Sequence, residues 1–517
     1  MKTVKTATRP QLAPMANQTA SAASRRTDEL VIGLVGPVGS GVSFCGRLLT
    51  EILVNDYAYV GRVIKLSDLI NQAAHRVKKE ITKPDDSERI SKLQEVGNEL
   101  RKQFGKEYLS HLAVRDININ RGNPDRPPQA RRYFTVLDSI KHPHEVTALR
   151  DIYEDAFILI GVFAPETIRR RRLMTDGRTD AYVAGVLERD QADGSEFGQN
   201  VKATIEFSDF YVRNDGESDG KPKLALGRFF EILFGINVHT PTREEQAMQA
   251  ATSVAAGSAC MSRQVGAVLI SEKGEMIGQG MNDVPRFGGG LYGSEDGDKD
   301  NRCWKWKNKE CLNEIKKNKL MTSIGIELTN AEALKLDVGP KVSQAILKAG
   351  VGNLIEFSRS VHAEMEAIIS AARAGKVGLV GSTLFTTTFP CHNCARHLVA
   401  SGVKRVIYIE PYSKSLALEL HSDSISVDEG DKDHKVVFLQ YEGVAPRNVI
   451  RLFLQRAERK RDGRLYTKQR ASASPSSKAP LDGFAIREQH VVAELEVNEV
   501  EHGQRKKREE EGEPKIV

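Results

Sequence analysis

One histidine and two cysteines stand at metal-ligand spacing in two separate segments of the chain. The first segment, VHAEMEAI, contains His362 and Glu364, and the second, FPCHNCA, contains Cys391 and Cys394. An imidazole and two thiolates can bind one metal ion only if the fold brings the two segments together. Each segment opens a run of helical period, so we expect the ligands at the starts of two helices. Unpaired amides there favour a thiolate over a thiol.

The pattern H-x-E followed by P-C-x-x-C is the signature of zinc-dependent deaminases. Three protein ligands leave the fourth tetrahedral position of Zn²⁺ for water, whose pKa the metal lowers toward about 7. We therefore predict that His362, Cys391 and Cys394 bind zinc. Glu364 is the predicted catalytic residue, which takes a proton from the water and delivers it to the base and then to the departing ammonia. The alternative is a closed structural zinc site, which would need a fourth cysteine or histidine where this chain has a glutamate.

The residues around this pattern resemble the cytidine deaminase fold, and within it the deoxycytidylate deaminases. The resemblance extends from Glu244 to about Glu410. It rests on SACMSRQVGAVLISEKGEMIGQGMNDVP ahead of HAEMEAI, and on PCHNCARHLVASGVKRVIYIEPY after it. The family usually has Gly-Tyr-Asn-Gly where this chain has GMND, so Met281 and Asp283 depart from its pattern.

The same resemblance implies four substrate contacts. Asn282 is expected to contact the sugar, and the backbone amide of Ala363 to hold the pyrimidine carbonyl. Ser258 and Arg263 lie where the family places phosphate contacts, and a guanidinium suits a phosphate through its two parallel donors. A turn residue at Asn282 and a solvated surface arginine at Arg263 are the structural alternatives.

A second motif, GPVGSGVS, nearly matches the phosphate-binding P-loop G-x-x-x-x-G-K-[ST], with Val42 in the lysine position. A strand-like run precedes it and a helical run follows, as a phosphate loop requires, and its backbone amides can cradle phosphates without a lysine. Because Val42 removes the charge that would follow a transferred phosphoryl group, we expect nucleotide binding without kinase turnover. A Mg²⁺ ion could be held by Ser43 and Asp138. The candidate nucleotide-binding residues are Gly36, Gly39, Ser40, Gly41, Val42 and Ser43.

The surroundings of this loop resemble small P-loop kinases that act on nucleotides or cofactors. TVLDSIKHPHEVTALR, ILIGVFAPETIRRRR and FSDFYVRNDG resemble their sheet core, arginine-bearing helix and last strand. Apolar runs alternate with helical segments, which predicts a parallel sheet with helical crossovers. The predicted fold class is therefore α/β. A P-loop NTPase/kinase-like parallel-sheet domain is followed by an α/β/α cytidine deaminase-like domain.

Composition shifts suggest four segments: a flexible tail at 1–27, the P-loop domain at 28–238, the deaminase domain at 239–460 and a mixed-charge tail at 461–517. The first tail lacks the apolar centre of a secretory signal. The last is predicted to be mostly disordered, because charges of both signs, Ser and Ala predominate. The deaminase domain carries a long Gly-, Asp- and Lys-rich insertion at about 285–360, which we interpret as a lid or a partner surface.

Composition also disfavours some functions. The net charge is only +6, from 75 basic and 69 acidic residues, which does not favour binding to a long nucleic acid. No apolar run approaches the roughly 20 residues that span a bilayer, so we expect a cytoplasmic protein without a membrane partner. The six cysteines fit metal binding better than a disulfide framework. Cys303 and Cys311 leave a second metal site open, because two thiols are too few ligands.

The two domains together resemble the bacterial anti-phage deoxycytidine nucleotide deaminases. That resemblance implies conversion of dCTP and dCMP to their uracil forms during infection, and inhibition by a small RNA in some members. Oligomers are common among deaminases, so we expect a homo-oligomer. The alternatives are a housekeeping dCMP deaminase, a deaminase of RNA or single-stranded DNA, and a catalytically silent nucleotide sensor. The residues do not decide between monophosphate and triphosphate substrates.

Overall fold

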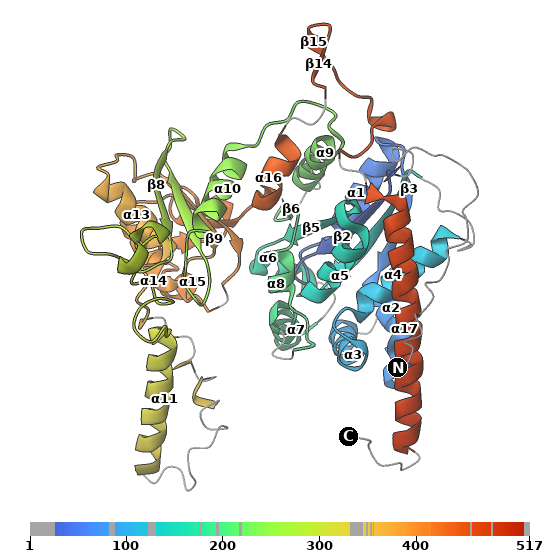
Figure 1. The fold of residues 1–517 in the computed structure, drawn as a ribbon, viewed down its shortest axis with the longest axis horizontal. Coiled ribbons are helices and arrows are strands. Elements are labelled where there is room, and N and C mark those ends of the chain that lie inside the picture. Colours follow the sequence, from blue (N-terminus) through green and yellow to red (C-terminus); the bar gives the residue numbers. More distant parts are fainter. Residues whose placement is uncertain are drawn as a thin grey trace, which may run out of the picture.

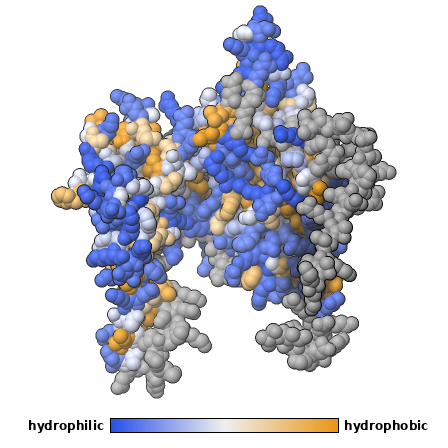
Figure 2. Space-filling view, in the orientation of Figure 1, coloured by the Kyte–Doolittle hydropathy of each residue, from blue (hydrophilic) through white to orange (hydrophobic). Residues whose placement is uncertain are grey.

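The computed structural model contains two six-stranded sheets, each with helices packed against it (Figure 1). It describes residues 26–510 apart from 82–87, 123–130, 175–177, 193–195, 217–219, 331–344, 348–349, 352–353, 355, 413, 455–457 and 477–478. The predicted flexible tail lies almost wholly outside the described residues. Hydrophilic residues cover most of the face shown in Figure 2. Within the described part of the chain, no helix combines the length and apolarity needed to cross a bilayer.

The first sheet has the strand order β13-β6-β5-β2-β4-β3. Its five longer strands run parallel, which confirms the predicted parallel sheet with helical crossovers. β2 and β5 are buried along their whole length, as expected of central strands with helices on both faces. These strands are β2 (Leu30–Val35), β3 (Val60–Lys65), β4 (Tyr133–Ile140), β5 (Phe157–Phe163) and β6 (Phe210–Arg213). The helices are α1 (Val42–Asn55), α2 (Leu66–Ala73), α3 (Arg89–Phe104), α4 (Tyr108–Arg121), α5 (Pro143–Tyr153), α6 (Glu166–Met174), α7 (Asp180–Ala192), α8 (Val201–Ile205) and α9 (Gly220–Phe234).

The second sheet has the order β11-β12-β10-β9-β7-β8. β7 and β8 form an antiparallel hairpin, while β9, β10, β12 and β11 run parallel. The strands are β7 (Gly266–Ile270), β8 (Met276–Met281), β9 (Thr383–Thr388), β10 (Arg405–Glu410), β11 (Ile425–Ser426) and β12 (Val436–Gln440). The helices are α10 (Arg243–Ala255), α13 (Ala363–Arg373), α14 (His392–Ala400) and α15 (Ala417–Leu420). The predicted fold class is confirmed for both domains.

Two glycines let β8 lie directly against α13. A Cβ at Gly278 would stand 2.3 Å from the carbonyl oxygen of Ala367, and one at Gly280 would stand 2.3 Å from that of Ala363. No side chain fits at such distances without moving the helix. The glycines of the hairpin therefore set the position of the α13 N-terminus, where two of the predicted site residues lie.

The insertion contains ordered structure in the part that is described. It includes the 3₁₀ segment η4 (Ser294–Lys299) and the helix α11 (Leu312–Asn330), which projects away from both sheets (Figure 1). A buried polar group fastens its base to the hairpin. Arg302 pairs with Asp300 at 2.9 Å and lies 3.7 Å from Asp283, which also accepts a hydrogen bond from the Ala259 amide. Asp283, one of the departures from the family pattern, thus has a structural partner.

The predicted boundary at residue 460 is wrong, because the chain returns to the first domain earlier. β13 (Gly443–Val444) pairs antiparallel with β6 at the edge of the first sheet, and α16 (Pro446–Phe453) follows it. Near the C-terminus, β16 (Ala479–Pro480) pairs with β1 (Arg26–Thr27).

The predicted disorder of residues 461–517 is also wrong for most of that segment. The 30-residue helix α17 (Leu481–Glu510) lies along α4 (Figure 1). It buries four apolar side chains in the core of the first domain, which offsets the entropy of ordering the segment. They are Leu481, Phe484, Ala485 and Leu495. Residues 511–517 lie outside the described part.

Candidate active site

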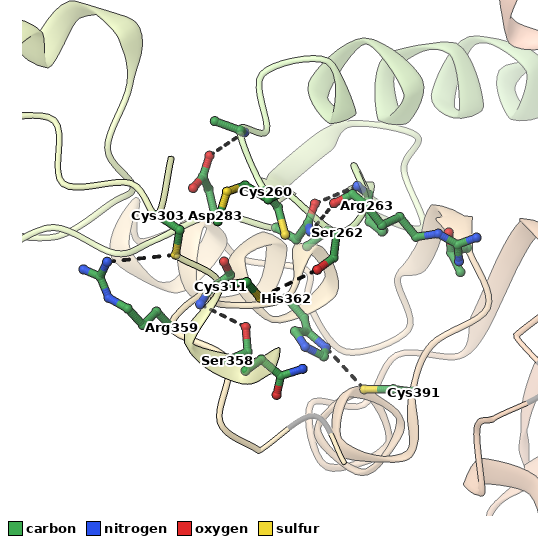
Figure 3. Close-up of a pocket in the computed structure, with 18 of the residues that line it drawn as sticks. Cys260, Ser262, Arg263, Asp283, Cys303, Cys311, Ser358, Arg359, His362 and Cys391 are labelled. Carbon is green, nitrogen blue, oxygen red and sulfur yellow. Dashed lines mark hydrogen bonds between the residues drawn. The ribbon is translucent and has the colours of Figure 1, made fainter. Parts of the chain in front are cut away.

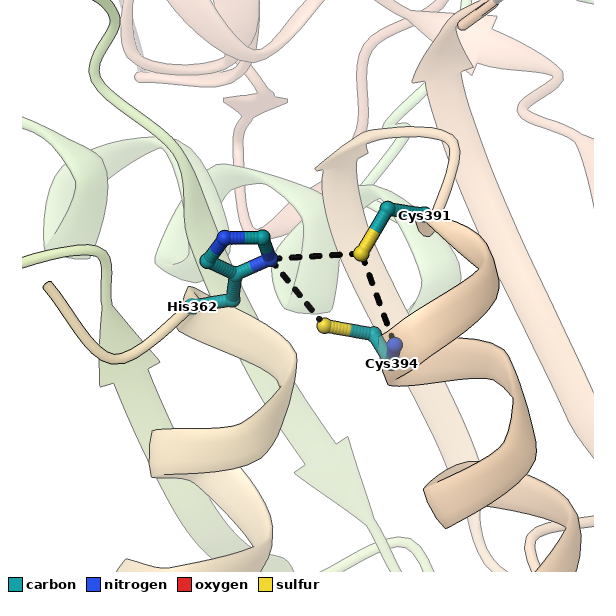
Figure 4. Close-up of side chains that lie close together, drawn as sticks. All are labelled: His362, Cys391 and Cys394. Atoms are coloured by element: carbon teal, nitrogen blue, oxygen red, sulfur yellow. Dashed lines mark hydrogen bonds between the residues drawn. The ribbon is translucent and has the colours of Figure 1, made fainter. Parts of the chain in front are cut away.

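The three predicted zinc ligands meet where two helices begin (Figure 4). His362 is the N-cap residue of α13 and Cys391 that of α14. Nδ1 of His362 lies 3.3 Å from Sγ of Cys391 and 3.4 Å from Sγ of Cys394. Tetrahedral zinc with ordinary Zn–S and Zn–N bonds needs ligand atoms about 3.5 Å apart, so the donor set fits this ion.

The charge state of the ligands also suits a metal. The amide of Cys394 donates to Sγ of Cys391 at 3.4 Å. Hydrogen bonds from Cys394 and His362 outweigh the effect of burial and lower the pKa of Cys391 to about 4. A thiolate is the form that binds zinc, so this helix start supplies it at neutral pH.

Glu364 lies in the first turn of α13 and is 4% exposed. Burial, and then the neighbouring Cys391 charge, raise the pKa of Glu364 to about 7. A carboxyl group with a pKa near the working pH can both accept and release a proton, which is what a general acid and base must do.

A cavity of about 220 Å³ opens beside these residues. His362, Ala363, Glu364 and Cys391 line it together with side chains from the hairpin and the insertion (Figure 3). It therefore combines a metal-ligand group, a buried acid and room for a small ring, which is the usual makeup of a small-molecule site.

Three of the four residues predicted to contact the substrate line this cavity, and the fourth, Ser258, does not. Asn282, Arg263 and Ala363 line it. The Asn282 side chain accepts from the Val265 amide and donates to the Arg263 carbonyl, both at 2.7 Å. Ser258 is buried outside the cavity, and its hydroxyl donates to the Asn282 carbonyl at 2.7 Å. It therefore helps to fix the backbone position of Asn282 rather than contacting a substrate.

One cationic residue of the cavity escaped the sequence analysis. Arg359, from the end of the insertion, lines the cavity, and its guanidinium lies 3.8 Å from the centre of the Trp306 ring. Arg263, the other guanidinium that lines the cavity, pairs with Glu410 of β10. Arg359 therefore adds a second guanidinium that could contact a substrate in this cavity. No local pattern marks Arg359, since the fold alone brings the insertion to the zinc ligands.

Three further thiols line the same cavity. The sequence left a second metal site open at Cys303 and Cys311, and the structure adds Cys260 from the segment before β7 (Figure 3). Burial raises the pKa of Cys303. Within the described ranges, the group of three metal-binding side chains whose ligand atoms lie within 4.8 Å of one another is the one at His362. These thiols do not form a second such group.

The P-loop motif takes the shape that its glycines require. Gly39 and Gly41 have φ angles of +81° and +85°, and α1 begins at Val42. The Ser43 hydroxyl donates to Asp138 at 2.6 Å, so the two residues predicted to hold Mg²⁺ are neighbours. Gly36 and Ser40 belong to the same turn, since a Cβ at Gly36 would stand 2.6 Å from the Ser40 hydroxyl.

A lysine that the motif does not contain lies against this loop. Lys141, just after β4, donates to the Gly36 carbonyl at 2.8 Å and pairs with the buried Asp190 at 2.9 Å. The other carboxylate oxygen of Asp190 accepts from the Val38 amide at 2.7 Å. Lys141 and Asp190 therefore brace the start of the loop. Their distance from it along the chain explains why sequence reasoning missed them.

Comparison with known proteins finds a family model that matches part of the second domain. Residues 241–410 match the cytidine and deoxycytidylate deaminase zinc-binding region. Deoxycytidylate deaminase of Enterobacteria phage T2 is 42% identical over 55 residues, which are 11% of this chain and 29% of that protein. The chain thus spans less than a third of this relative's length.

Two other comparisons cover larger shares of the chain. A UPF0200/UPF0201 protein of Archaeoglobus fulgidus is 24% identical over 255 residues, 48% of this chain and 69% of that protein. The crystal structure of dCMP deaminase from the cyanophage S-TIM5 is 17% identical, with a TM-score of 0.22, covering 39% of this chain and all of that one.

Proposed function

We propose that the protein is a zinc-dependent hydrolase that deaminates deoxycytidine nucleotides, dCMP and dCTP, to the corresponding uracil nucleotides. One observation carries the proposal. The buried Glu364 stands at the start of the helix whose N-cap, His362, meets Cys391 and Cys394 beside a cavity of about 220 Å³. The match of residues 241–410 to the deaminase zinc-binding region supports it independently.

His362, Cys391 and Cys394 would hold the zinc ion, which would supply a water with a pKa lowered toward about 7. Glu364 accepts one proton from the attacking water and passes it to the ring nitrogen next to the amino-bearing carbon. It then takes the second proton from the hydroxyl group added at that carbon and gives it to the departing amino group, which leaves as ammonia. Water adds at that carbon and the carbon–nitrogen bond to the amino group breaks, so cytosine and water give uracil and ammonia. The amide of Ala363 holds the pyrimidine carbonyl, and Asn282 faces the sugar.

In this proposal, the two arginines that line the cavity bind the substrate phosphate. Arg263 and Arg359 both line the cavity, and each offers a guanidinium fork that can take two phosphate oxygens. Arg263 must then share its charge with Glu410, with which it pairs in this structure. Two guanidinium groups favour a nucleotide over a free nucleoside.

The P-loop domain, in this proposal, binds a nucleotide with Mg²⁺ and does not transfer phosphate, because Val42 replaces the lysine and Lys141 is held by Asp190. The resemblance to anti-phage deaminases supports a role in depleting dCTP during phage infection, in the cytoplasm and as a homo-oligomer. The same resemblance makes a small inhibitory RNA a candidate partner.

The test is to incubate the zinc-loaded protein separately with dCTP, dCMP, CTP and cytidine and to follow the uracil products. Conversion of the deoxynucleotides should fall at least a thousandfold in Glu364→Ala. Glu366→Gln is the matched control, because Glu366 lies on the same helix, pairs with Arg373 and does not line the cavity. It should keep more than half of the activity.

Failure to convert any of the four substrates, with zinc bound, would refute the proposal in favour of a polymer substrate or a silent sensor. The P-loop half has its own test. Phosphate transfer from ATP or GTP in a Glu364→Ala sample would show kinase turnover and overturn the regulatory assignment.

A further inference from the structure

A second cavity, of about 330 Å³, lies between the two domains. One wall is formed by the segments that follow β2, β5 and β6 of the first sheet. The other is formed by the ends of β10 and β12 of the second sheet and the segments after them. The carboxyl ends of parallel strands are where α/β proteins bind ligands. Here the carboxyl ends of two sheets face one space, and none of the three zinc ligands lines it.

The charged groups of this cavity favour an anion. Three cations line it, Arg169, Lys202 and Arg213, against two carboxylates, Glu166 and Asp215. Arg213 pairs with Asp215, and Arg169 donates to backbone carbonyls of its own domain. The balance is one positive charge, which matches a ligand with a single phosphate group better than one with three.

Lys202 supplies the remaining charge, and it lies within the electrostatic range of the carboxyl groups of Glu410 and Glu206 and of two other cations, Arg263 and Lys414. Within the part of the chain that the structure describes, it forms no ion pair and no hydrogen bond through its ammonium group. The ammonium lies 5.6 Å from the centre of the Tyr412 ring, across the domain boundary. Burial lowers the pKa of Lys202, because the charged form is poorly solvated there. An anion bound beside it would remove this penalty.

The opposite wall is aromatic. Phe389 directly follows β9, Tyr408 lies in β10 and Phe438 in β12, and the rings of Phe389 and Tyr408 meet edge to face with centroids 4.9 Å apart. Apolar aromatic walls with a few placed polar groups are what planar ligands require. The volume lies at the lower end of the roughly 300–1,000 Å³ range of small-molecule pockets.

We propose that this interdomain cavity is an effector site for a nucleoside monophosphate, with the base against Phe389 and Tyr408 and the phosphate at Lys202. The site is separate from the P-loop, of which it includes only Pro37. Phe389 and Tyr412 line both this cavity and the zinc cavity, so the two spaces share a wall. A base that packs against this wall changes the room available to the deaminase substrate. Occupancy therefore acts on substrate binding, while the zinc ligands stay in place.

The test is to titrate the full-length, zinc-loaded protein calorimetrically with AMP, GMP and dTMP, with inorganic phosphate and adenosine as the phosphate-only and base-only probes. At least one monophosphate should bind at least tenfold more tightly than either partial probe. Lys202→Met should weaken that binding at least tenfold. Leu418→Trp, which fills the exposed edge of the cavity, should do the same. Lys404→Met is the matched control, since Lys404 is exposed, does not line the cavity and is not among the charges that act on Lys202.

Two results would overturn the site: no binding by any monophosphate, or equal binding to the native protein, Lys202→Met and Leu418→Trp. The effector role rests on the proposed deamination and has its own measurement. At a saturating monophosphate concentration, the KM for dCMP should change at least threefold with kcat within twofold, and an unchanged KM would overturn that role. If the chain deaminated no substrate, the proposed function would fail, but the titration would still decide whether the cavity binds its ligand.

Discussion

Replacing Arg121 with methionine should strongly destabilise the first domain, because one guanidinium joins three elements there. Arg121 ends α4 and is 10% exposed. It donates to both oxygens of Glu488 on α17, at 2.7 and 2.8 Å, and to Glu29 just before β2 at 2.9 Å. Glu488 is fully buried and Glu29 is 6% exposed.

The size of the effect follows from what the substitution leaves behind. Methionine keeps most of the packing of the arginine stem but removes all the donors, so Glu488 loses its principal partner inside the protein. Removing one partner of a buried ion pair costs about 3–5 kcal/mol, most of it for the stranded charge. Glu29 keeps a second partner, Arg131 at 3.0 Å, and adds little to this loss. We expect the free energy of unfolding to fall by about 3–4 kcal/mol at pH 8.

The assay is urea unfolding of the full-length protein, followed by circular dichroism, at pH 8 and pH 5.5. The loss should be smaller at the lower pH, because a stranded carboxyl group protonates more readily there and a neutral carboxyl is less costly to bury. Glu488→Leu in the Arg121→Met background should recover part of the loss, since it removes the stranded charge.

Arg115→Met is the matched control. Arg115 lies on the same helix and reaches Glu499 of α17 at 3.5 Å, but it is 30% exposed, so its loss should cost less than about 1 kcal/mol. If Arg121→Met cost no more than Arg115→Met, the buried packing of α17 against α4 would be refuted. The prediction of a disordered tail would then be restored.

Three other predictions test the site and the domain boundary. Gly280→Ala should displace the start of α13, because its Cβ would lie 2.3 Å from the Ala363 carbonyl. The zinc content measured by mass spectrometry should then fall below half of the native value. Lys141→Met should lower the free energy of unfolding by about 3 kcal/mol, because it leaves the buried Asp190 without its cation, whereas Lys414→Met should change it by less than about 0.5 kcal/mol. Burial and the neighbouring Glu410 raise the pKa of Glu206 from 4.5 to about 8, so the folded protein holds this proton more tightly than the unfolded chain. Its contribution to stability is therefore lost progressively between about pH 4.5 and pH 8. Because the Glu206 side chain is exposed and solvent screens its charge, the effect is small, and Glu206→Gln should raise the Tm by less than about 2 °C at pH 9 with no change at pH 4.5.

Local pattern was enough to predict the zinc-ligand group. His362 and Cys391 are each N-cap residues, and a helix start is encoded by the few residues around it. The strands of the first sheet were predictable for the same reason, since β2 and β5 are continuous apolar runs. Contacts made by distant segments leave no such local signal. Arg359 reaches the cavity only through the fold of the insertion, and Ser258 lies under Asn282 rather than in the cavity.

The error on the C-terminal segment has a physical cause. Charged side chains outnumber apolar ones in α17, and composition alone therefore suggested that it could not offset the cost of ordering. Four of its apolar residues nevertheless recur at helical spacing and are buried where the helix contacts α4 and α5: Leu481, Phe484, Ala485 and Leu495. The charges that suggested disorder include Glu488, which the core uses to hold Arg121. A charged segment can fold when another part of the protein offers an apolar surface for it to pack against. Here α4 and α5 of the first domain form that surface.

The consequence of having Val42 in place of the P-loop lysine depends on which cations lie near the loop. Val42 alone left open whether another cation had taken over the role of the lysine. Lys141 is the lysine nearest to the start of the loop, alongside Arg169 and Arg172, which donate to other loop carbonyls, but its ammonium is held between the buried Asp190 and the Gly36 carbonyl. If Lys141 moved toward a phosphoryl group, the buried Asp190 would lose its cation, at a cost of about 3–5 kcal/mol. That cost would fall on phosphoryl transfer, the step that depends most on electrostatic stabilisation. Lys141 therefore stiffens the loop without supplying the lost charge. This arrangement favours a domain that holds a nucleotide over one that transfers its phosphate.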